Sequence, residues 1–249
     1  MGNKMKTIKM MLGVIVASLS LSANASLISV GTFTGGDSGE GLDLSGNFTY
    51  AVNVFGNGGF SIGDAAFTND SVSGVSISAV NSIPNWHTAN YGSTANDNDL
   101  ETVMRSIRWS PRVNSGNQAR DDVLTIDLAN LTVGSTYSLQ LLFAETCCTR
   151  GFDVAFEGAL AVDDFSPYTV QGAGLNTSAT NIPTVGAFIR YDFTAQDSIL
   201  NIAFGGAAPF NDNNPIINGF TLEATDVSAP STLALFALSL IVFARIRRA

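Results

Sequence analysis

One short segment of the chain concentrates aromatic and amide side chains. The segment IPNWHTANYG contains Trp86, Asn90 and Tyr91. In carbohydrate sites, aromatic rings cover the apolar C–H face of the sugar, while amide, carboxylate and guanidinium groups pair with its hydroxyls. We therefore predict that Trp86 and Tyr91 form a sugar platform on a loop. The alternative is that Trp86 is an anchor of the hydrophobic core.

Further side chains of suitable type lie on other predicted loops. These glycan-binding candidates are Asp164, Tyr168 and Asn211, and Asn90 joins them as a polar neighbour of the platform. In a sandwich of sheets the inner faces are filled, so ligand contacts are expected from the loops of one rim or from an exposed sheet face.

The chain contains fragments of catalytic motifs without the groups that those motifs need. The sequence GDSG at 36–39 also surrounds the nucleophile of trypsin-like proteases, but the chain has one histidine, His87, which lies in unrelated surroundings. A serine nucleophile needs a histidine base and an acid that orients it. The adjacent acidic pairs at 121–122 and 163–164 are neighbours in sequence, and side chains of neighbouring residues on a strand point to opposite faces. The two carboxylates of a pair therefore cannot lie on either side of one sugar. No catalytic residue is predicted, and an enzyme is the less favoured alternative.

Two acidic and amide-rich segments contain oxygen ligands that suit calcium. They are ANDNDLE at 95–101 and FNDNNP at 210–215. Neither has the spacing of a calcium loop, with its glycine and distal glutamate. A structural calcium ion stays open, solvated turns are the favoured interpretation, and no metal ligand or other cofactor is predicted.

The only two cysteines, Cys147 and Cys148, are adjacent and cannot join distant parts of the chain. They either form a vicinal disulfide, an eight-membered ring, in an oxidising compartment or remain as free thiols. The simpler interpretation is a pair of loop residues without a redox function.

Short segments with a period of two recur along the chain and predict the elements that carry these groups. Separated by Gly/Asn/Asp turns, they favour an all-β antiparallel β-sandwich. Helical periodicity is found only in the two terminal segments. The predicted strands are Leu27 to Phe33, Phe48 to Phe55, Val72 to Val80, Val103 to Trp109 and Val123 to Leu128, with further strands at 137–143, 152–156, 189–193, 200–204 and 216–222.

Two of these segments carry a resemblance to a known group of domains. The sequences YSLQLLFAE at 137–145 and RGFDVAFEG at 150–158 resemble paired motifs of the malectin-like group of carbohydrate-binding jelly rolls. The likeness continues through AVDDF, LNIAFGG and NPIINGFTLEA and is clearest over residues 98–224. Upstream, NDLETVMRSIRWS looks like the strand that precedes this core.

The resemblance implies a galactose-binding-like jelly roll over residues 26–224, with aromatic rings and an acidic residue at its ligand rim. It places the cysteines in the loop between two adjacent strands. There Arg150 is expected to close the loop by pairing with Glu145 or Asp153.

The first 25 residues have the pattern of a secretory signal peptide. Three lysines precede an apolar run, and the triplet Ala23-Asn24-Ala25 follows it. This order of charge, apolar run and small residues predicts export by the Sec route with cleavage between Ala25 and Ser26.

The other end, after a linker at 225–228, resembles the PEP-CTERM sorting signal. In the tail at 229–249, Pro230 and Ser231 lie at the sorting motif, an apolar segment spans 233–244, and arginines follow. At ~1.5 Å per residue that segment covers about 18 Å, short of the ~30 Å of a hydrocarbon core. The resemblance implies recognition by an exosortase and transient anchoring of the helical tail in the inner membrane. The tail is then either removed or used as an anchor, and the body of the protein ends at the cell surface or outside the cell.

The negative net charge of the chain excludes one class of partner. Between the two terminal segments, six arginines against 21 acidic residues leave a formal charge of −15. Such a surface repels nucleic acid. We therefore expect an exported surface or matrix protein that binds polysaccharide without catalysis, with a purely structural matrix protein as the alternative.

Overall fold

The computed structural model describes residues 26–111, 124–172, 182–205 and 214–225. Within these ranges no helix is both long and apolar enough to cross a membrane. The processing residues Ala25, Pro230 and Ser231 and the two terminal helices expected from the sequence lie outside the described residues.

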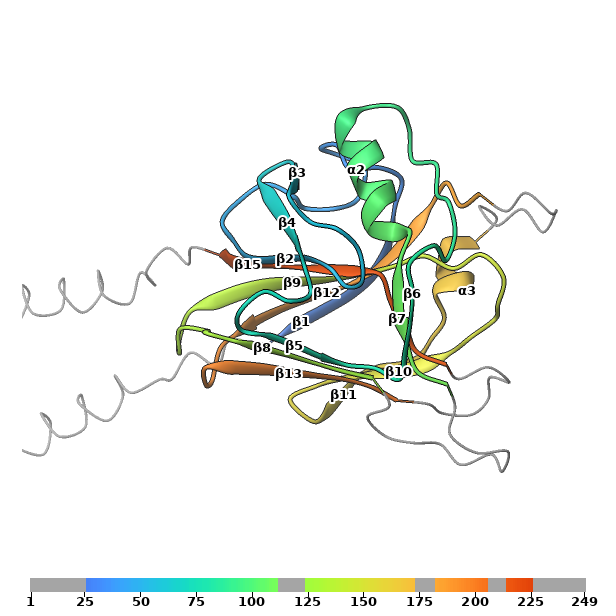
Figure 1. Cartoon of the computed structure of the whole chain (residues 1–249). Coiled ribbons are helices and arrows are strands. Elements are labelled where there is room, and N and C mark those ends of the chain that lie inside the picture. The colour runs from blue at the N-terminus through green and yellow to red at the C-terminus, as the bar shows by residue number, and fades with distance from the viewer. Residues whose placement is uncertain (1–25, 112–123, 173–181, 206–213, 226–249) are drawn as a thin grey trace, which may run out of the picture.

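The described chain is a sandwich of two main sheets with a small third sheet at one side (Figure 1). Neighbouring strands are antiparallel except β2 and β4, which are parallel. The predicted all-β antiparallel sandwich is therefore confirmed. The larger sheet runs in the order β1 (Leu27–Phe33), β12 (Gly186–Thr194), β9 (Thr136–Phe143), β15 (Gly219–Thr225), β2 (Phe48–Asn53), β4 (Ala65–Asn69), β3 (Phe60–Ile62). The second runs β11 (Ala159–Phe165), β10 (Phe152–Phe156), β13 (Ile199–Gly205), β8 (Leu124–Ala129), β5 (Val75–Ser78), and the third β14 (Ile216–Ile217), β7 (Ile107–Trp109), β6 (Asn81–Ile83).

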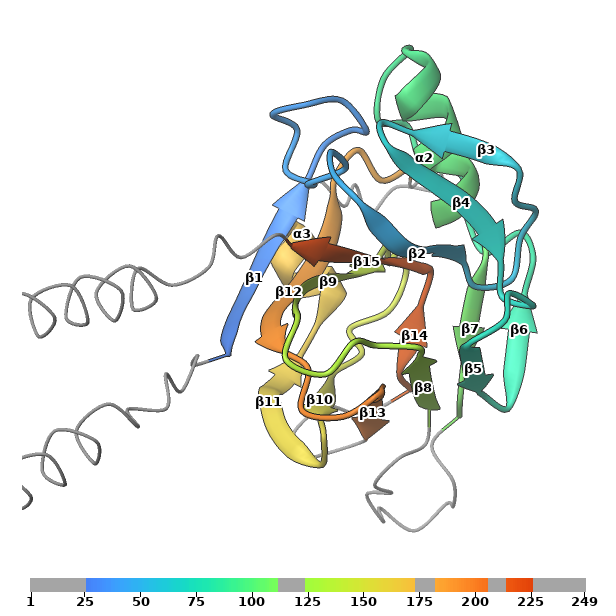
Figure 2. The ribbon, with the colours of Figure 1, turned by 90° about the vertical axis from the view of Figure 1, so that its left-hand side faces the viewer.

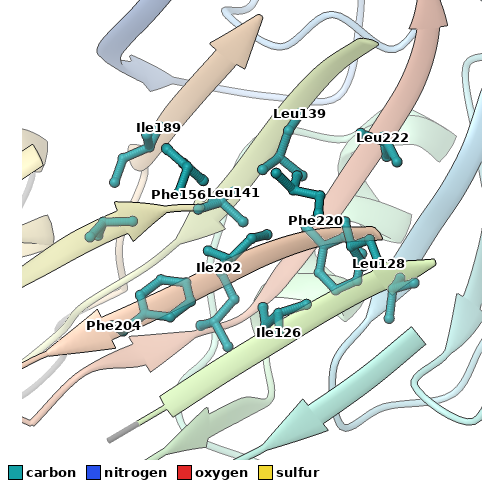
Figure 3. Close-up of a cluster of buried hydrophobic side chains, with 14 of the residues drawn as sticks. Ile126, Leu128, Leu139, Leu141, Phe156, Ile189, Ile202, Phe204, Phe220 and Leu222 are labelled. Atoms are coloured by element: carbon teal, nitrogen blue, oxygen red, sulfur yellow. The ribbon is translucent and has the colours of Figure 1, made fainter. Parts of the chain in front are cut away.

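The main core fills the space between the two large sheets. Strand β8 shows how the sequence builds it, because its residues alternate between buried and half-buried along the strand. Alternation of this kind turns one face of each strand inward. Figure 3 shows the resulting layer, in which Ile126 and Ile202 of one sheet meet Leu141 and Phe220 of the other.

A second core lies on the outer face of the larger sheet, under helix α2 (Ala95–Met104). The helix supplies Leu100, Val103 and Met104, and the sheet supplies Ala51 and Leu142. Strand β9 is therefore buried on both faces, unlike an ordinary sandwich strand. Figure 2 shows α2 beside β3 and β4 above the sheet.

Helix α2 corrects the strand predicted from Val103 to Trp109. Thr94 caps its first turn: the Thr94 hydroxyl accepts from the Asp97 N–H (3.1 Å), and the Asp97 carboxylate accepts from the Thr94 N–H (3.1 Å). This reciprocal pair satisfies two amides that a helix start leaves open. The segment NDLETVM is helical, and only Ile107–Trp109 is a strand.

Other strand boundaries also differ from those predicted from the sequence. Strand β5 covers only Val75–Ser78 of the predicted segment from Val72 to Val80. A second short helix, α3 (Pro167–Gln171), follows β11, and strands β3, β4 and β6 have no counterpart among the predicted strands.

Candidate functional site

A cleft of about 440 Å³ opens where the larger sheet, the third sheet and α2 meet. Its walls come from four places far apart in the sequence: the turns after β2 and β4, the connection from β6 to α2, and the end of α2. In Figure 2 these elements lie together on the side away from the described chain ends.

One wall of the cleft is an aromatic ring held by a charged pair. The Arg108 guanidinium carbon lies 4.8 Å from the centre of the Phe55 ring, and Arg108 also forms an ion pair with Asp70. The Arg108 Nε–H donates to the carbonyl of Val54 (3.1 Å), next to Phe55. These contacts hold Phe55 and Asp70 in the cleft lining and neutralise the Asp70 carboxylate.

The floor is set by the buried amide of Asn53. Its Nδ2 donates to the Asn57 carbonyl (3.1 Å), and its Oδ1 accepts from the Ser106 hydroxyl (2.9 Å). The turn after β2 is thereby tied to the residues after α2. A Cβ at Gly56 would overlap the Asn53 amide, so this close approach requires glycine.

The opposite wall is formed by the connection from β6 and the end of α2. The backbone N–H of Trp86 donates to the Arg105 carbonyl (2.7 Å), which holds the connection against the helix end. Asn85 and Arg105 are both exposed and both line the cleft.

The lining has the composition of a sugar site. Amides of Asn57, Asn69 and Asn85 can donate to and accept from hydroxyls, and the Phe55 ring can cover a C–H face. Among the described lining residues Asp70 is the one carboxylate, and it is paired with Arg108. Hydrolysis of a glycoside normally needs two carboxylates that flank the bond. The arrangement suits binding rather than acid–base catalysis.

The sequence prediction missed most of this cleft. Of its residues, only the segment around Asn85 lay within the stretch singled out for sugar binding. The turns FGNGGF and TND that supply Phe55, Asn57 and Asn69 have a loop composition, but nothing in their spacing shows that they meet.

The structure corrects the predicted role of Tyr91. Its side chain is buried in the second core, with its ring centre 5.4 Å from that of Phe33. Burial raises the pKa of the Tyr91 hydroxyl, and the nearby Glu101 carboxylate adds to the effect. A ring in this position supports α2 and cannot serve as an exposed sugar platform.

Trp86 is half-buried and packs against the main core. The guanidinium carbon of Arg150 lies 5.6 Å from the centre of its ring. Arg150 itself forms an ion pair with Glu145, and their side chains are only 5% and 0% exposed. Of the two partners expected for Arg150, Glu145 and Asp153, the structure shows Glu145, and the Trp86 ring packs against the guanidinium of this buried pair.

The loop around Glu145 is built on hydrogen bonds to that carboxylate. Glu145 Oε1 accepts from the backbone N–H groups of Thr146 (2.9 Å) and Cys147 (3.1 Å). On the other side, Arg150 Nη1 donates to the Asn214 carbonyl (2.9 Å). Cys147 and Cys148 are joined by a disulfide, with Cys147 exposed.

Replacing Cys147 and Cys148 together by serine is expected to lower the free energy of unfolding by less than ~1–2 kcal/mol, as loop changes do. A vicinal ring closes no long loop in the unfolded chain and stiffens only its own turn. Urea unfolding of the double variant tests this, with reduced wild-type protein as the comparison. An unfolded double variant would contradict the interpretation.

The remaining predicted contacts are dispersed. Asn90 is exposed, and its backbone N–H donates to the Pro183 carbonyl (2.9 Å). Tyr168 lies half-buried in α3, and no described contact joins it or Asp164 to Trp86. Asn211 lies outside the described residues.

Asp164 lies at the end of β11 beside two other carboxylates, those of Asp153 and Asp163. Partial burial, followed by repulsion from Asp163 and Asp153, raises the pKa of Asp164. The backbone N–H of Asp164 donates to Asp153 Oδ1 (3.0 Å). Asp164 itself has a left-handed backbone conformation, with φ of 52°. The three carboxylates could attract a cation. The positive φ of Asp164 is also what a strained turn without a cation would show.

A second acidic group joins the N-terminus of α2 to the glycine-rich loop at 34–47. Carboxylate oxygens of Asp37, Glu40 and Asp97 lie within 4.8 Å of one another. Burial acts to raise the pKa of Asp97, but hydrogen bonds from the Gly36 and Thr94 backbone outweigh it and hold the pKa below its usual value. Asp97 therefore acts as a tie between loop and helix, although these carboxylates could also hold a cation.

His87 is the one histidine of the chain and both of its ring nitrogens are buried. Within the described ranges neither nitrogen has a hydrogen-bond partner. Burial lowers the pKa of His87 from 6.5 to about 4, so its ring is neutral at pH 7.

Comparison with solved structures shows similarity to two plant extracellular domains. The extracellular domain of ANXUR2 from Arabidopsis thaliana matches with a TM-score of 0.53 and 13% identity, over 73% of this chain and 49% of that one. The ANXUR1 extracellular domain matches at 0.51 and 14%, over 72% and 49%. The similarity concerns the fold alone. It is consistent with the malectin-like domain that the sequence motifs resemble.

The chain thus spans about half the length of these plant domains. A β-glucuronidase 2 from Bacteroides uniformis, covalently bound to cyclophellitol-6-carboxylate aziridine, also matches, with a TM-score of 0.47 and 15% identity, over 71% of this chain and 18% of that one. At that level the similarity does not bear on function. The sequence matches no protein-family model and no curated protein.

Proposed function

We propose that this protein binds a glycan, without catalysis, in the cleft between α2 and the turns after β2 and β4. The observation that carries the proposal is the lining of that cleft: an aromatic ring and several amides around about 440 Å³ of space. A volume of that size lies within the range of small-molecule sites, about 300–1,000 Å³. The malectin-like fold agrees with such a role but does not establish it.

The two terminal segments would carry the protein to its ligand outside the cytoplasm. The signal-peptide pattern before Ser26 and the PEP-CTERM-like tail around Pro230 and Ser231 support export by Sec and sorting by an exosortase. The glycan would then be a polysaccharide of the cell surface or matrix. The strongly acidic composition suits such surroundings, which are rich in cations.

Binding is expected to weaken when the cleft loses a polar or aromatic group. Replacing Asn85 by alanine should cost about 1 kcal/mol, or about fivefold in affinity, for a lost hydrogen bond. Replacing Phe55 by alanine should cost ~1–3 kcal/mol, for the apolar area that it covers. A glycan array identifies the ligand, and calorimetry then measures its affinity for each variant.

Asn90→Ala is the matched control, since Asn85 and Asn90 are exposed asparagines of the same connection and only Asn85 lines the cleft. If Asn90→Ala weakens binding while Asn85→Ala does not, the ligand lies on the surface predicted from the sequence and the cleft is wrong. If no glycan binds, the purely structural role is favoured. Turnover of a polysaccharide would instead indicate an enzyme.

A further inference from the structure

Arg105 is a cation in the cleft without a partner. It caps the C-terminus of α2 and its side chain is exposed. Within the described parts of the chain, its guanidinium makes no hydrogen bond or ion pair. Every other described arginine pairs with a carboxylate: Arg108 with Asp70, Arg150 with Glu145, and Arg190 with Asp43 and Asp192.

Arg105 is unpaired although the domain is rich in carboxylates. Residues 26–226 have six arginines against 21 acidic residues, so carboxylates are plentiful. Yet the described cleft contains one carboxylate, Asp70, and Arg108 already neutralises it. Counting Arg108 with the lining residues, the described charges at the cleft sum to +1, whereas residues 26–226 as a whole sum to −15.

Arg105 lies at the C-terminal end of α2, where the backbone alone would not attract an anion. The C-terminus of a helix carries partial negative charge, which repels anions. The Arg105 carbonyl is engaged by the Trp86 N–H (2.7 Å), so one of the terminal acceptors is covered. The guanidinium is the cationic group of that wall, and its planar donors match an oxyanion.

We infer that the cleft selects an acidic saccharide, whose carboxylate or sulfate group pairs with Arg105 while its hydroxyls meet the asparagines. This inference rests on the proposed function and names its ligand class. The negative charge of the rest of the surface would keep acidic polymers away from other sites, so the cleft supplies both attraction and selectivity.

The test compares acidic and neutral forms of the same polymer. Probes are alginate, carboxyl-reduced alginate, chondroitin sulfate, desulfated chondroitin and neutral dextran, titrated calorimetrically into the purified protein. Alginate or chondroitin sulfate is expected to bind, and loss of the acidic group should weaken binding about tenfold or more, as for a charged hydrogen bond. Carboxyl reduction and desulfation separate the two anionic groups.

Arg105→Gln is expected to weaken binding of the acidic probe by a similar factor, and Arg105→Lys by less, because lysine retains the charge without the planar donors. Arg190→Gln is the control, since it changes the net charge equally and Arg190 lies outside this cleft, with its own carboxylate partners. Thermal unfolding establishes that each variant is folded.

The outcomes separate this inference from the proposed function. Neutral dextran or carboxyl-reduced alginate binding in the cleft as tightly as the acidic forms would overturn the acidic specificity and leave glycan binding in place. Equal affinity of Arg105→Gln and wild type for the acidic probe would do the same. Absence of binding to all probes and to a wider glycan array would overturn both.

Discussion

Replacing Glu145 by alanine is expected to lower the free energy of unfolding by about 3–5 kcal/mol. The change leaves the Arg150 guanidinium, whose side chain is 5% exposed, in the interior without its counter-charge. It also removes the acceptor for the backbone N–H groups of Thr146 and Cys147. Urea unfolding of the purified protein measures the loss.

A second substitution separates the buried charge from the lost packing. In Glu145→Ala with Arg150→Met, no unpaired charge remains, so stability should recover part of the loss. Glu145→Gln retains an acceptor and should cost less than alanine. A loss below about 1 kcal/mol in Glu145→Ala, typical of an exposed ion pair, would show that water reaches this pair.

Acidification from pH 7 to pH 4 is expected to destabilise the protein by up to ~3 kcal/mol through His87 alone, at about 1.4 kcal/mol for each unit of pKa difference. The pKa of His87 is about 4 in the fold and 6.5 in the unfolded chain. Between these values the unfolded chain binds more protons, so acid favours unfolding. The contribution is complete above pH 6.5 and is lost as the pH falls towards 4.

The His87→Gln variant isolates this contribution, because glutamine is polar but does not titrate. Chemical unfolding at a series of pH values should show a flatter profile for the variant than for wild type between pH 6.5 and 4. Asp97, whose pKa is below its usual value, contributes its own loss only below pH ~4 in both proteins. Parallel profiles for the two proteins would mean that the His87 ring is hydrated in the fold.

Several strands could be predicted because they bury one face and so alternate in sequence. The segment of β8 does this residue by residue. Helix α2 was missed although its sequence carries two helix signals. Thr94 and Asp97 have the spacing of a capping box, and Leu100, Val103 and Met104 have the spacing of one helical face. The asparagines and aspartates of its first turns favour a loop when read alone.

Missing α2 also explains the wrong role of Tyr91. An aromatic residue on a loop outside the strands would be exposed in a two-layer sandwich. In this protein α2 adds a second core above the larger sheet, and Tyr91 fills it. The cleft as a whole could not be predicted, since Phe55, Asn69, Asn85 and Arg105 come together only through the tertiary fold.

The register of the larger sheet places the cleft and the two ends of the described chain at opposite poles. Leu27 pairs with Asp192, Asp192 with Ser138, and Ser138 with Glu223, so β1 begins where β15 ends. Asn53, on the floor of the cleft, pairs with Gly219 at the other end of β15, roughly 20 Å away at ~3.4 Å per residue. A domain tethered through either end would therefore stand with its cleft facing outward from the supporting surface. If the cleft binds a polysaccharide as proposed, neighbouring copies on one support could bind the same polymer chain, and many weak contacts would add up to a firm attachment.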